Sequence, residues 1–246
     1  MRKNKEFDMK KAIIVGASSG IGRYLAKILA GKGYAVGLVA RRGDALRNIQ
    51  GELQSTTYIK AIDIRNRGDT LKGLTGLITE MGGVDLVIIS SGIGFINPEL
   101  DLDKELETVA TNVQGFVTVA NVAFRHFIRQ GAGHLVGISS IAAIRGGAEA
   151  PAYNASKAFI SNYLQGLRQK AAKSKLTITV TDVQPGFVDT DMAKGEGIFW
   201  MAPVQKAAAQ IYRAIERKRS HAFVTKRWRL VAWMLKIMPD FLYHRI

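Results

Sequence analysis

The segment that decides the fold reads Lys11–Ala12–Ile13–Ile14–Val15–Gly16–Ala17–Ser18–Ser19–Gly20–Ile21–Gly22. Four apolar residues follow Lys11 and favour a buried strand, and Gly16 allows the tight turn that comes next. Gly20 lets the backbone approach a ligand closely, and Gly22 lets the following helix pack against the strand. A strand, a glycine-rich turn and a helix start in this order favour dinucleotide binding, with a pyrophosphate at the helix N-terminus.

Outward from this segment, short apolar runs alternate with longer runs of helical periodicity. The predicted strands are 12–15, 35–40, 58–62, 84–89, 134–139 and 176–183, and the predicted helices include 21–30, 101–129 and 152–173. Such alternation predicts parallel strands joined by helical crossovers, and nearly continuous apolar strands indicate helices on both faces. We therefore predict an α/β fold with a single doubly wound parallel sheet.

Composition narrows the class of protein. The chain has 246 residues, 47% of them hydrophobic and 22% charged, so a packed core is expected. It contains no cysteine, which excludes disulfides, thiolate metal sites and a cysteine nucleophile and is compatible with the cytoplasm. Its four histidines stand far apart, so no metal site is predicted. No apolar run reaches the roughly 18 residues of a simple transmembrane helix.

Charge is the unusual feature of the composition. The chain has 35 Lys and Arg residues against 20 Asp and Glu residues, a net charge of +15. This balance favours an anionic partner, such as nucleic acid, an anionic lipid, a phosphorylated cofactor or an acidic protein, or else describes a basic surface with no dedicated partner. No helix-turn-helix, zinc-finger or RNA-binding signature is present, so no nucleic-acid partner is predicted.

The residues after the second predicted strand bear on the type of dinucleotide. An acidic residue at this place would bind the adenosine ribose hydroxyls and select NAD. The chain has Arg41 and Arg42 instead. Guanidinium groups suit a 2′-phosphate through their charge and donor geometry, so we predict that NADP(H) is preferred over NAD(H). The other interpretation is a solvated basic turn.

Two residues with complementary proton chemistry lie in the predicted helix 152–173. Tyr153 and Lys157 are four residues apart, which places both on one helix face. A phenol titrates near pH 10, and an adjacent ammonium lowers that pKa. Ser140 stands at the end of an earlier apolar strand, where its hydroxyl can donate to a substrate oxygen. Alone, the Tyr-x-x-x-Lys pair also fits an amphipathic helix with one exposed lysine.

Together these motifs resemble the short-chain dehydrogenases/reductases over nearly the whole chain. The glycine loop matches the family's Gly-x-x-x-Gly-x-Gly, and Ser140, Tyr153 and Lys157 match its catalytic serine, tyrosine and lysine. Asn112, in Thr-Asn-Val-Gln-Gly, matches the asparagine of the family's Asn-Val-x-Gly element. The resemblance implies a Rossmann-like fold. The predicted cofactor-binding residues are then Gly16, Ser18, Ser19, Gly20, Ile21, Gly22, Arg41, Arg42, Asp63, Ile64, Ser90, Ser91, Gly92, Tyr153, Lys157, Pro185, Gly186, Val188 and Thr190.

The resemblance also implies a mechanism, in which NADP(H) exchanges a hydride with a carbonyl or alcohol carbon. Ser140 hydrogen-bonds the substrate oxygen, and Tyr153 donates or accepts the proton. Lys157 lowers the pKa of Tyr153 and binds the nicotinamide ribose, and Asn112 holds a water that relays protons to solvent. Residues 63–64 contact the adenine.

Two positions depart from the family pattern. Val15 stands where the family usually has threonine, and Ile89–Ser90–Ser91–Gly92 stands where it usually has Asn-Asn-Ala-Gly. Serine makes fewer hydrogen bonds than asparagine. We therefore expect Ser90 to brace the central strands less well than an asparagine would.

Residues 190–202 lie where the family builds its substrate lid, after a loop at 185–190 that by resemblance holds the nicotinamide carboxamide. Aromatic residues give this region an apolar wall, whereas Arg145 either meets an anionic substrate or is a solvated loop charge. The substrate is predicted to be a small carbonyl or alcohol, apolar or lipid-like. The predicted substrate-binding residues are Ser140, Arg145, Tyr153, Phe187, Phe199 and Trp200.

The C-terminal segment is basic and apolar. Residues 213–229 contain seven basic residues and one acid, and residues 228–238 combine two tryptophans with Arg229 and Lys236 on one helical stripe. This pattern fits either an interfacial helix on the anionic inner face of a membrane or a subunit contact, since the family forms homodimers and homotetramers. We assign residues 1–225 to the catalytic domain and 226–246 to a tail of the same domain.

Two other classes share part of this pattern. A sugar-nucleotide epimerase or dehydratase has the Tyr-x-x-x-Lys pair, but usually with another glycine spacing and a longer C-terminal domain. A non-enzymatic protein that binds a membrane, a lipid or a nucleotide would keep the fold without turnover. The complete set of Asn112, Ser140, Tyr153 and Lys157 favours an NADP(H)-dependent oxidoreductase that interconverts a carbonyl and an alcohol.

Overall fold

Seven parallel strands form one sheet in the part of the chain that the computed structural model describes, residues 9–192, 200–243 and 245. Their order across the sheet is β3-β2-β1-β4-β5-β6-β7. The strands are β1 (Lys11–Val15), β2 (Ala35–Ala40), β3 (Thr57–Ala61), β4 (Leu86–Ile89), β5 (Ala132–Ile138), β6 (Thr177–Pro185) and β7 (His221–Val224). The predicted doubly wound parallel sheet is confirmed.

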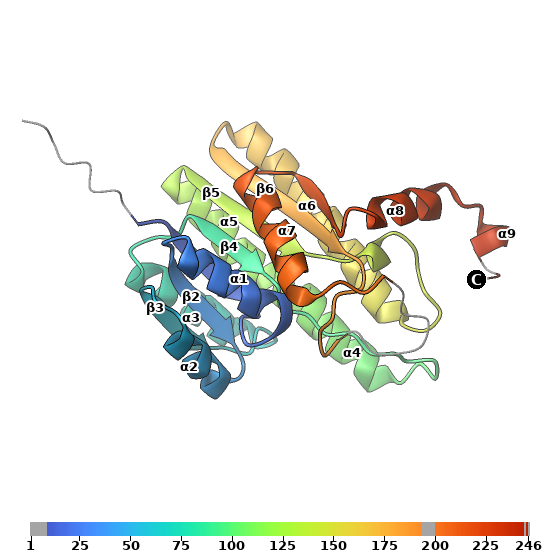
Figure 1. The fold of residues 1–246 in the computed structure, drawn as a ribbon, viewed down its shortest axis with the longest axis horizontal. Coiled ribbons are helices and arrows are strands. Elements are labelled where there is room, and N and C mark those ends of the chain that lie inside the picture. The colour runs from blue at the N-terminus through green and yellow to red at the C-terminus, as the bar shows by residue number, and fades with distance from the viewer. Residues whose placement is uncertain (1–8, 193–199, 244, 246) are drawn as a thin grey trace, which may run out of the picture.

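Helices cover both faces of this sheet (Figure 1). One layer consists of α1 (Gly20–Gly31), α2 (Gly43–Glu52) and α7 (Val204–Glu216), and the other of α3 (Arg67–Glu80), α5 (Phe116–Gln130) and α6 (Pro151–Ser174). The alternation of side chains along β1 explains the two cores. Ala12 and Ile14 belong to the core under the first layer, and Ile13 and Val15 to the core under the second.

The structure differs from the predicted elements in two places. The predicted helix 101–129 consists of α4 (Leu102–Val109), a π-helical turn (Ala110–Gly115) and α5. The last strand, β7, was not predicted, because its four residues begin with an exposed histidine and are too few to show a strand pattern. The π-helical turn carries Asn112, whose side chain is described below.

The strand order reverses between β1 and β4, which pair with each other at the centre of the sheet. In open α/β sheets, ligands bind outside the carboxyl ends of the strands at such a point. Gly16 follows β1, Ser90 follows β4, Ser139 follows β5, and Pro185 ends β6. The topology therefore brings the predicted motifs to one edge of the sheet.

After β7 the chain forms α8 (Trp228–Ile237) and α9 (Asp240–Tyr243), which extend beyond the end of the sheet in Figure 1. Trp228 anchors this segment: it is only 2% exposed, and a Cβ added to Gly186 would lie 2.0 Å from its indole ring. Within the described ranges, no helix combines the length and apolarity needed to cross a bilayer.

Candidate active site

The glycine loop between β1 and α1 makes close backbone contacts that only glycine permits. Gly16 has a φ of +89°, and a Cβ on it would lie 2.5 Å from the backbone nitrogen of Ser91. A Cβ on Gly22 would lie 2.1 Å from the carbonyl oxygen of Gly16. These contacts hold the N-terminus of α1 against the ends of β1 and β4, where its free N–H groups can bind phosphate. The Ser91 hydroxyl oxygen is buried there without a hydrogen-bond partner among the described residues.

The end of β2 contributes positive charge to the same loop. Arg42 extends its guanidinium toward the loop, with Nη2 3.4 Å from the Ser18 hydroxyl oxygen. Arg41 and Arg42 are both exposed. The structure thus places Arg42, one of the two predicted 2′-phosphate residues, next to the predicted pyrophosphate site.

The two predicted adenine-contacting residues lie in different surroundings. The Asp63 carboxylate accepts hydrogen bonds from Arg65, whose Nη2 lies 2.6 Å from Oδ2, and this pairing lowers the pKa of Asp63 below its ordinary value. Ile64 is buried in the core, and a Cβ added to Gly115 would lie 2.7 Å from its side chain. Asp63 is therefore the more accessible of the pair.

Ser140, Tyr153 and Lys157 meet where the end of β5 packs against α6. The Ser140 hydroxyl hydrogen-bonds Tyr153, and its oxygen also accepts from the backbone nitrogen of Ala142 at 3.1 Å. The Lys157 ammonium lies 5.6 Å from the centre of the Tyr153 ring and donates to the carbonyl oxygen of Ile138 at 3.2 Å. The three predicted catalytic side chains are thus in one cluster.

Burial dominates the titration of this cluster. It raises the pKa of Tyr153 above its ordinary value, and the hydrogen bond from Ser140 opposes that rise. Burial also lowers the pKa of Lys157 to about 8, and the negative charge of Asp182 opposes that fall. The expected net lowering of the Tyr153 pKa is absent in this structure, because desolvation of the phenolate outweighs the favourable contact.

Asn112 braces the loop that follows β4. It is fully buried: its Oδ1 accepts from the backbone nitrogen of Ile93 at 2.9 Å, and its Nδ2 donates to the Ile93 carbonyl at 2.7 Å and to the Ser156 hydroxyl at 2.9 Å. Asn112 thus ties the loop after β4 to α6. The braced loop touches the cluster, since a Cβ on Gly94 would lie 2.7 Å from the Tyr153 ring.

Asp182 is a functional candidate that the sequence analysis missed. It lies on β6, is 1% exposed, and accepts from the hydroxyls of Ser139 at 2.5 Å and Ser161 at 2.6 Å. His221 Nε2 lies 3.8 Å from the same carboxylate. Its signal in the sequence is a single acid inside an otherwise uncharged strand, and only the sheet register shows what that acid meets.

The loop after β6 closes over the N-terminus of α1. A Cβ on Gly20 would lie 3.2 Å from the Thr190 methyl group. The loop is held by a bridge to residue 202: Asp189 donates its N–H to Ala202 at 2.9 Å, and Ala202 donates to Phe187 at 3.0 Å. The predicted nicotinamide loop therefore faces the predicted pyrophosphate loop.

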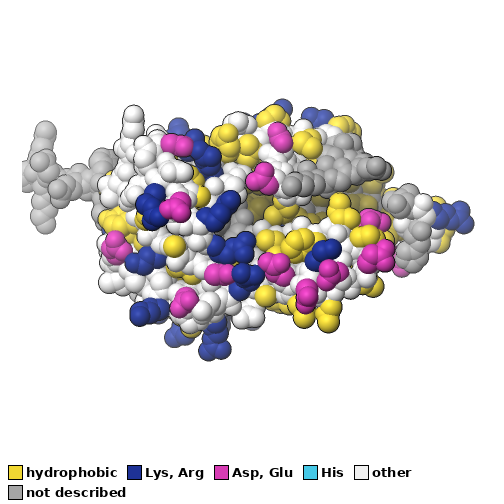
Figure 2. Space-filling model, turned by 90° about the horizontal axis from the view of Figure 1, so that it is seen from below, with side chains coloured by type: hydrophobic (Ala, Val, Ile, Leu, Met, Phe, Trp, Pro, Cys, Tyr) yellow, Lys and Arg dark blue, Asp and Glu magenta, His cyan; other side chains and the backbone are white. Residues whose placement is uncertain are grey.

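The predicted substrate residues are only partly brought together. Phe187 meets Trp228 edge to face, with 5.5 Å between ring centres, and Trp200 is 48% exposed beneath the guanidinium of Arg227. Phe199 and most of the predicted lid lie outside the described residues. Figure 2 shows a hollow with apolar side chains near the middle of one face, and Lys and Arg gathered on the half that carries the N-terminal strands.

Arg145 is engaged by the C-terminal helices. Its Nε donates to the carbonyl of Leu235 at 3.0 Å, Nη1 pairs with Asp240 at 2.5 Å, and Nη2 donates to the carbonyl of Met238. The structure therefore shows Arg145 as a link between the loop after Ser140 and the C-terminal segment.

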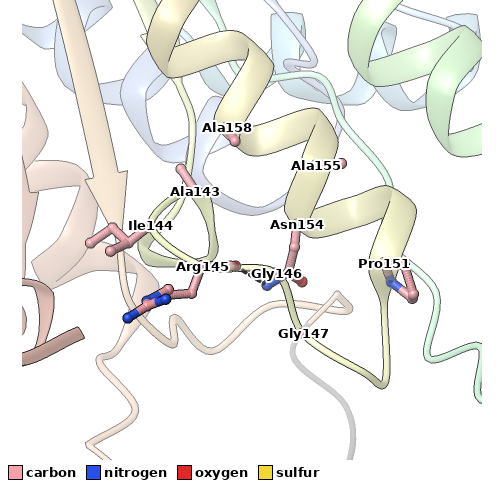
Figure 3. A pocket seen from close by; sticks show the side chains of 9 residues that line it. All are labelled: Ala143, Ile144, Arg145, Gly146, Gly147, Pro151, Asn154, Ala155 and Ala158. Atoms are coloured by element: carbon pink, nitrogen blue, oxygen red, sulfur yellow. Dashed lines mark hydrogen bonds between the residues drawn. The ribbon is translucent and has the colours of Figure 1, made fainter. Parts of the chain in front are cut away.

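A pocket of about 480 Å³ lies beside the cluster (Figure 3). It is an open pocket between the loop after β5 and one face of α6, and Arg145 forms part of its wall. None of the residues Ser140, Tyr153 and Lys157 lines this pocket. We therefore do not assign the catalytic step to it. Its lining residues are Ala143, Ile144, Arg145, Gly146, Gly147, Pro151, Asn154, Ala155 and Ala158.

Comparison with known proteins decides the family. The family model of the short chain dehydrogenases matches residues 10–197. The chain belongs to the short-chain dehydrogenase family. It is 31% identical to an uncharacterized oxidoreductase of Mycobacterium tuberculosis over 96% of both chains. It is 34% identical to one of Myxococcus xanthus over 76% of this chain and 75% of that protein.

A relative with a named activity is the 3-oxoacyl-(acyl-carrier-protein) reductase of Bos taurus, 28% identical over 74% of this chain and 79% of that protein. Among solved structures, a short chain dehydrogenase from Burkholderia cenocepacia in complex with NADP has a TM-score of 0.82 and 20% identity, covering 96% of this chain and 97% of that one. A 3-ketoacyl-(acyl-carrier-protein) reductase from Brucella melitensis in complex with NADH has a TM-score of 0.78 and 22% identity, covering 87% and 96%.

The predicted family is thus confirmed, and with it the class of reaction. The protein is an oxidoreductase of the short-chain dehydrogenase family.

Proposed function

We propose that this short-chain dehydrogenase is an NADP(H)-dependent enzyme that interconverts an apolar ketone or aldehyde and the corresponding alcohol. The observation that carries the proposal is the cluster of the buried Ser140 and Lys157 with the partly buried Tyr153 at the carboxyl edge of the sheet. A hydroxyl donor, a phenol and an ammonium within one cluster can bind a carbonyl oxygen and deliver a proton to it.

The cofactor residues fit a phosphorylated dinucleotide in three respects. Gly16 and Gly22 form a cradle that a Cβ would fill, and the buried Ser91 hydroxyl is left for a ligand to satisfy. Arg42, near Ser18, supplies charge where a 2′-phosphate would lie. When bound, NADP(H) supplies or accepts the hydride.

The protein's own contribution is to position and protonate the substrate oxygen. Ser140 donates a hydrogen bond to that oxygen as negative charge develops on it. Tyr153 transfers its hydroxyl proton to the same oxygen in the direction of reduction and takes it back in the direction of oxidation. Lys157, held by the carbonyl of Ile138, stabilises the phenolate that remains.

An apolar substrate is supported by the exposed side chains around the loop after β6. Met192 is 44% exposed, Trp200 48% and Met201 43%, an apolar rim for the site. The named activity of the bovine relative, reduction of a 3-oxoacyl group, also favours a ketone on an aliphatic chain.

We also propose a homodimer or homotetramer. On α4, Leu102 is 67% exposed and Leu106 56%, and on the neighbouring α6 Phe159 is 37% exposed. Burying such side chains between subunits would stabilise an assembly through the hydrophobic effect.

The deciding experiment is a screen for substrate-dependent NADPH oxidation, beginning with medium- and long-chain ketones and 3-oxoacyl thioesters. The control is Tyr153→Phe, which keeps the ring and removes the proton. The proposal is supported if the wild type turns over a substrate and the variant does not, although the variant still binds NADPH. If the variant turns over like the wild type, the assigned acid is wrong. No oxidation across a broad panel, with intact NADPH binding, would favour a non-enzymatic function.

A further inference from the structure

The helices α8 and α9 carry an exposed apolar face, and we propose that this face docks the enzyme on an anionic lipid bilayer. Five large side chains make up the docking face. Their exposed fractions are 67% for Leu230, 61% for Trp233, 53% for Met234, 59% for Ile237 and 64% for Phe241. The four on α8 are contiguous along one helix face, and exposed apolar side chains of this size grouped in this way mark an interaction surface rather than ordinary scatter.

The docking face is held in a fixed orientation. On α8 its residues follow the spacing i, i+3, i+4 and i+7, so they form one stripe. The opposite side of the helix is anchored, because Trp228 is 2% exposed and Ala232 is 1% exposed. The helix is therefore attached through its buried side, and the stripe faces outward.

Positive charge borders the stripe on both sides. Arg229 and Lys236 are two turns apart along one edge, and Arg227 lies on the other edge, just before the helix begins. All three are exposed, as is Lys226. An apolar face flanked by basic residues is the pattern of a helix that lies in an anionic membrane interface.

The structure divides the basic run predicted at 213–229. Arg217, Lys218 and Arg219 precede β7, whereas α8 follows it, so the length of the strand separates the two groups. The basic residues described above at the border of the docking face all follow β7. Acidic residues are few there: among the described residues from 226 to 243, the one acid is Asp240, which is paired with Arg145.

A second copy of the chain fits this face less well than a bilayer. Two such faces brought together would place like charges opposite each other. A handful of side chains also falls short of the roughly 20–30 residues that each partner contributes to a stable protein interface. The alternative partner for the docking face is the acidic surface of α4 on another copy of the chain. The test below distinguishes this subunit contact from membrane binding.

The docking face is connected to the active site at both ends of α8. Trp228 lies against Gly186 of the predicted nicotinamide loop, and Arg145 binds the carbonyls of Leu235 and Met238. If the proposed function holds, a docked enzyme would receive apolar ketones from the bilayer at the apolar rim of its site.

The test is sedimentation of the purified full-length protein with vesicles, which needs no turnover and so stands apart from the proposed reaction. Vesicles of phosphatidylcholine alone are compared with vesicles that also contain phosphatidylglycerol, at low and high salt. We expect binding to the anionic vesicles only, weakened by salt. Point variants are preferable to a truncation at Thr225, since removing Trp228 would uncover Gly186.

Two double variants separate the apolar and the electrostatic contributions to membrane binding. Trp233→Ser with Ile237→Ser should lower the partition coefficient about tenfold or more. Arg229→Glu with Lys236→Glu should lower it about 25-fold or more. The matched control is Leu71→Ser with Arg67→Glu and Lys72→Glu on α3, where all three residues are exposed and the net charge changes by as much as in the second double variant, and it should bind nearly like the wild type.

Three results would overturn the proposal. The first is that the wild type fails to sediment with anionic vesicles. The second is that the α3 control loses as much binding as the α8 variants, which would indicate attraction by net charge alone. The third is that the apolar variant binds vesicles normally and instead lowers the oligomeric mass in analytical ultracentrifugation. The last result would identify the face as a subunit contact.

Discussion

At the scale of single residues, Asp182 joins the two elements that carry the catalytic side chains. Its carboxylate binds the hydroxyl of Ser139, the residue before Ser140, and that of Ser161, one helical turn after Lys157. It also carries the negative charge that raises the pKa of Lys157 against the effect of burial. We therefore infer that Asp182 is a positioning residue, which acts through Ser140 and Lys157.

Replacing Asp182 with Asn should lower turnover about tenfold or more, because small displacements of catalytic groups are costly. Without its charge, the pKa of Lys157 falls further below about 8. The alkaline limb of the pH–rate profile should then move to lower pH, since less of the ammonium form remains at any given pH. The measurement is kcat/KM against pH for the variant and the wild type.

Ser161→Ala is the matched control for this prediction. It removes one hydrogen bond to the carboxylate and keeps the charge. It should lower the melting temperature by a few degrees and leave the alkaline limb in place. An alkaline limb that stays fixed in Asp182→Asn as well would reduce Asp182 to a structural role. His221 faces the same carboxylate from β7, and burial lowers its pKa.

At the scale of elements, the end of β2 and the glycine loop together set the cofactor preference. Arg42→Ala should weaken NADPH binding about tenfold and leave NADH binding nearly unchanged, because a charge-assisted contact is worth about 1.5–3 kcal/mol. Arg41→Asp should move the preference toward NADH, since a carboxylate repels a 2′-phosphate and accepts from ribose hydroxyls. Fluorescence titration with both cofactors measures the effect.

The control for the cofactor variants is Arg47→Ala on α2, which removes an exposed arginine that pairs with Asp44. It should leave both dissociation constants within about twofold of the wild type, because exposed ion pairs contribute little. Equal affinity of the wild type for NADPH and NADH would refute the assignment of Arg41 and Arg42.

The elements also show how far sequence reasoning reaches. The strand, glycine loop and helix at the N-terminus could be predicted because their signals lie within 12 consecutive residues. The doubly wound parallel sheet could be predicted from the alternation of strands and helices, because parallel neighbours need helical crossovers. Tyr153 and Lys157 were predicted from helical spacing, and Ser140 from its place after a strand.

What the sequence could not show is non-local. The contact of Asp182 with Ser139 and Ser161 depends on sheet register and on the packing of α6. The bracing of Ile93 by Asn112 depends on a π-helical turn that no local periodicity reveals. The engagement of Arg145 by α8 and α9 joins segments about 90 residues apart, which no spacing rule predicts.

At the scale of the whole molecule, the site introduces charge into an otherwise apolar interior. Two hydrophobic cores flank the sheet, and Lys157 and Asp182 are almost fully buried at its edge. A buried ammonium disfavours the folded state unless it is fully compensated. The fold therefore maintains Lys157 at a cost in stability, which the cores offset.

The sign of this cost follows from the pKa of Lys157, about 8 in the folded protein against an ordinary 10.5. Below pH 8 the ammonium is charged in both states, and its burial destabilises the folded state by up to about 3 kcal/mol. Between pH 8 and 10.5 the unfolded chain keeps a proton that the folded chain has released. The free energy of unfolding therefore rises with pH in that window because of Lys157. The activity falls in the same window, since it needs the ammonium form.

Lys157→Met should consequently abolish turnover and raise the free energy of unfolding at pH 7 by about 1–2 kcal/mol, less than the full cost because Asp182 loses an opposite charge. It should also remove the rise in stability between pH 8 and 10.5 that the wild type shows. Urea unfolding at several pH values measures both effects. Lys170→Met, at an exposed position of the same helix, should change neither. If Lys157→Met is less stable than the wild type at pH 7, then the ammonium is compensated in the folded state, and its contacts with Ile138 and Asp182 stabilise the fold as well as the site.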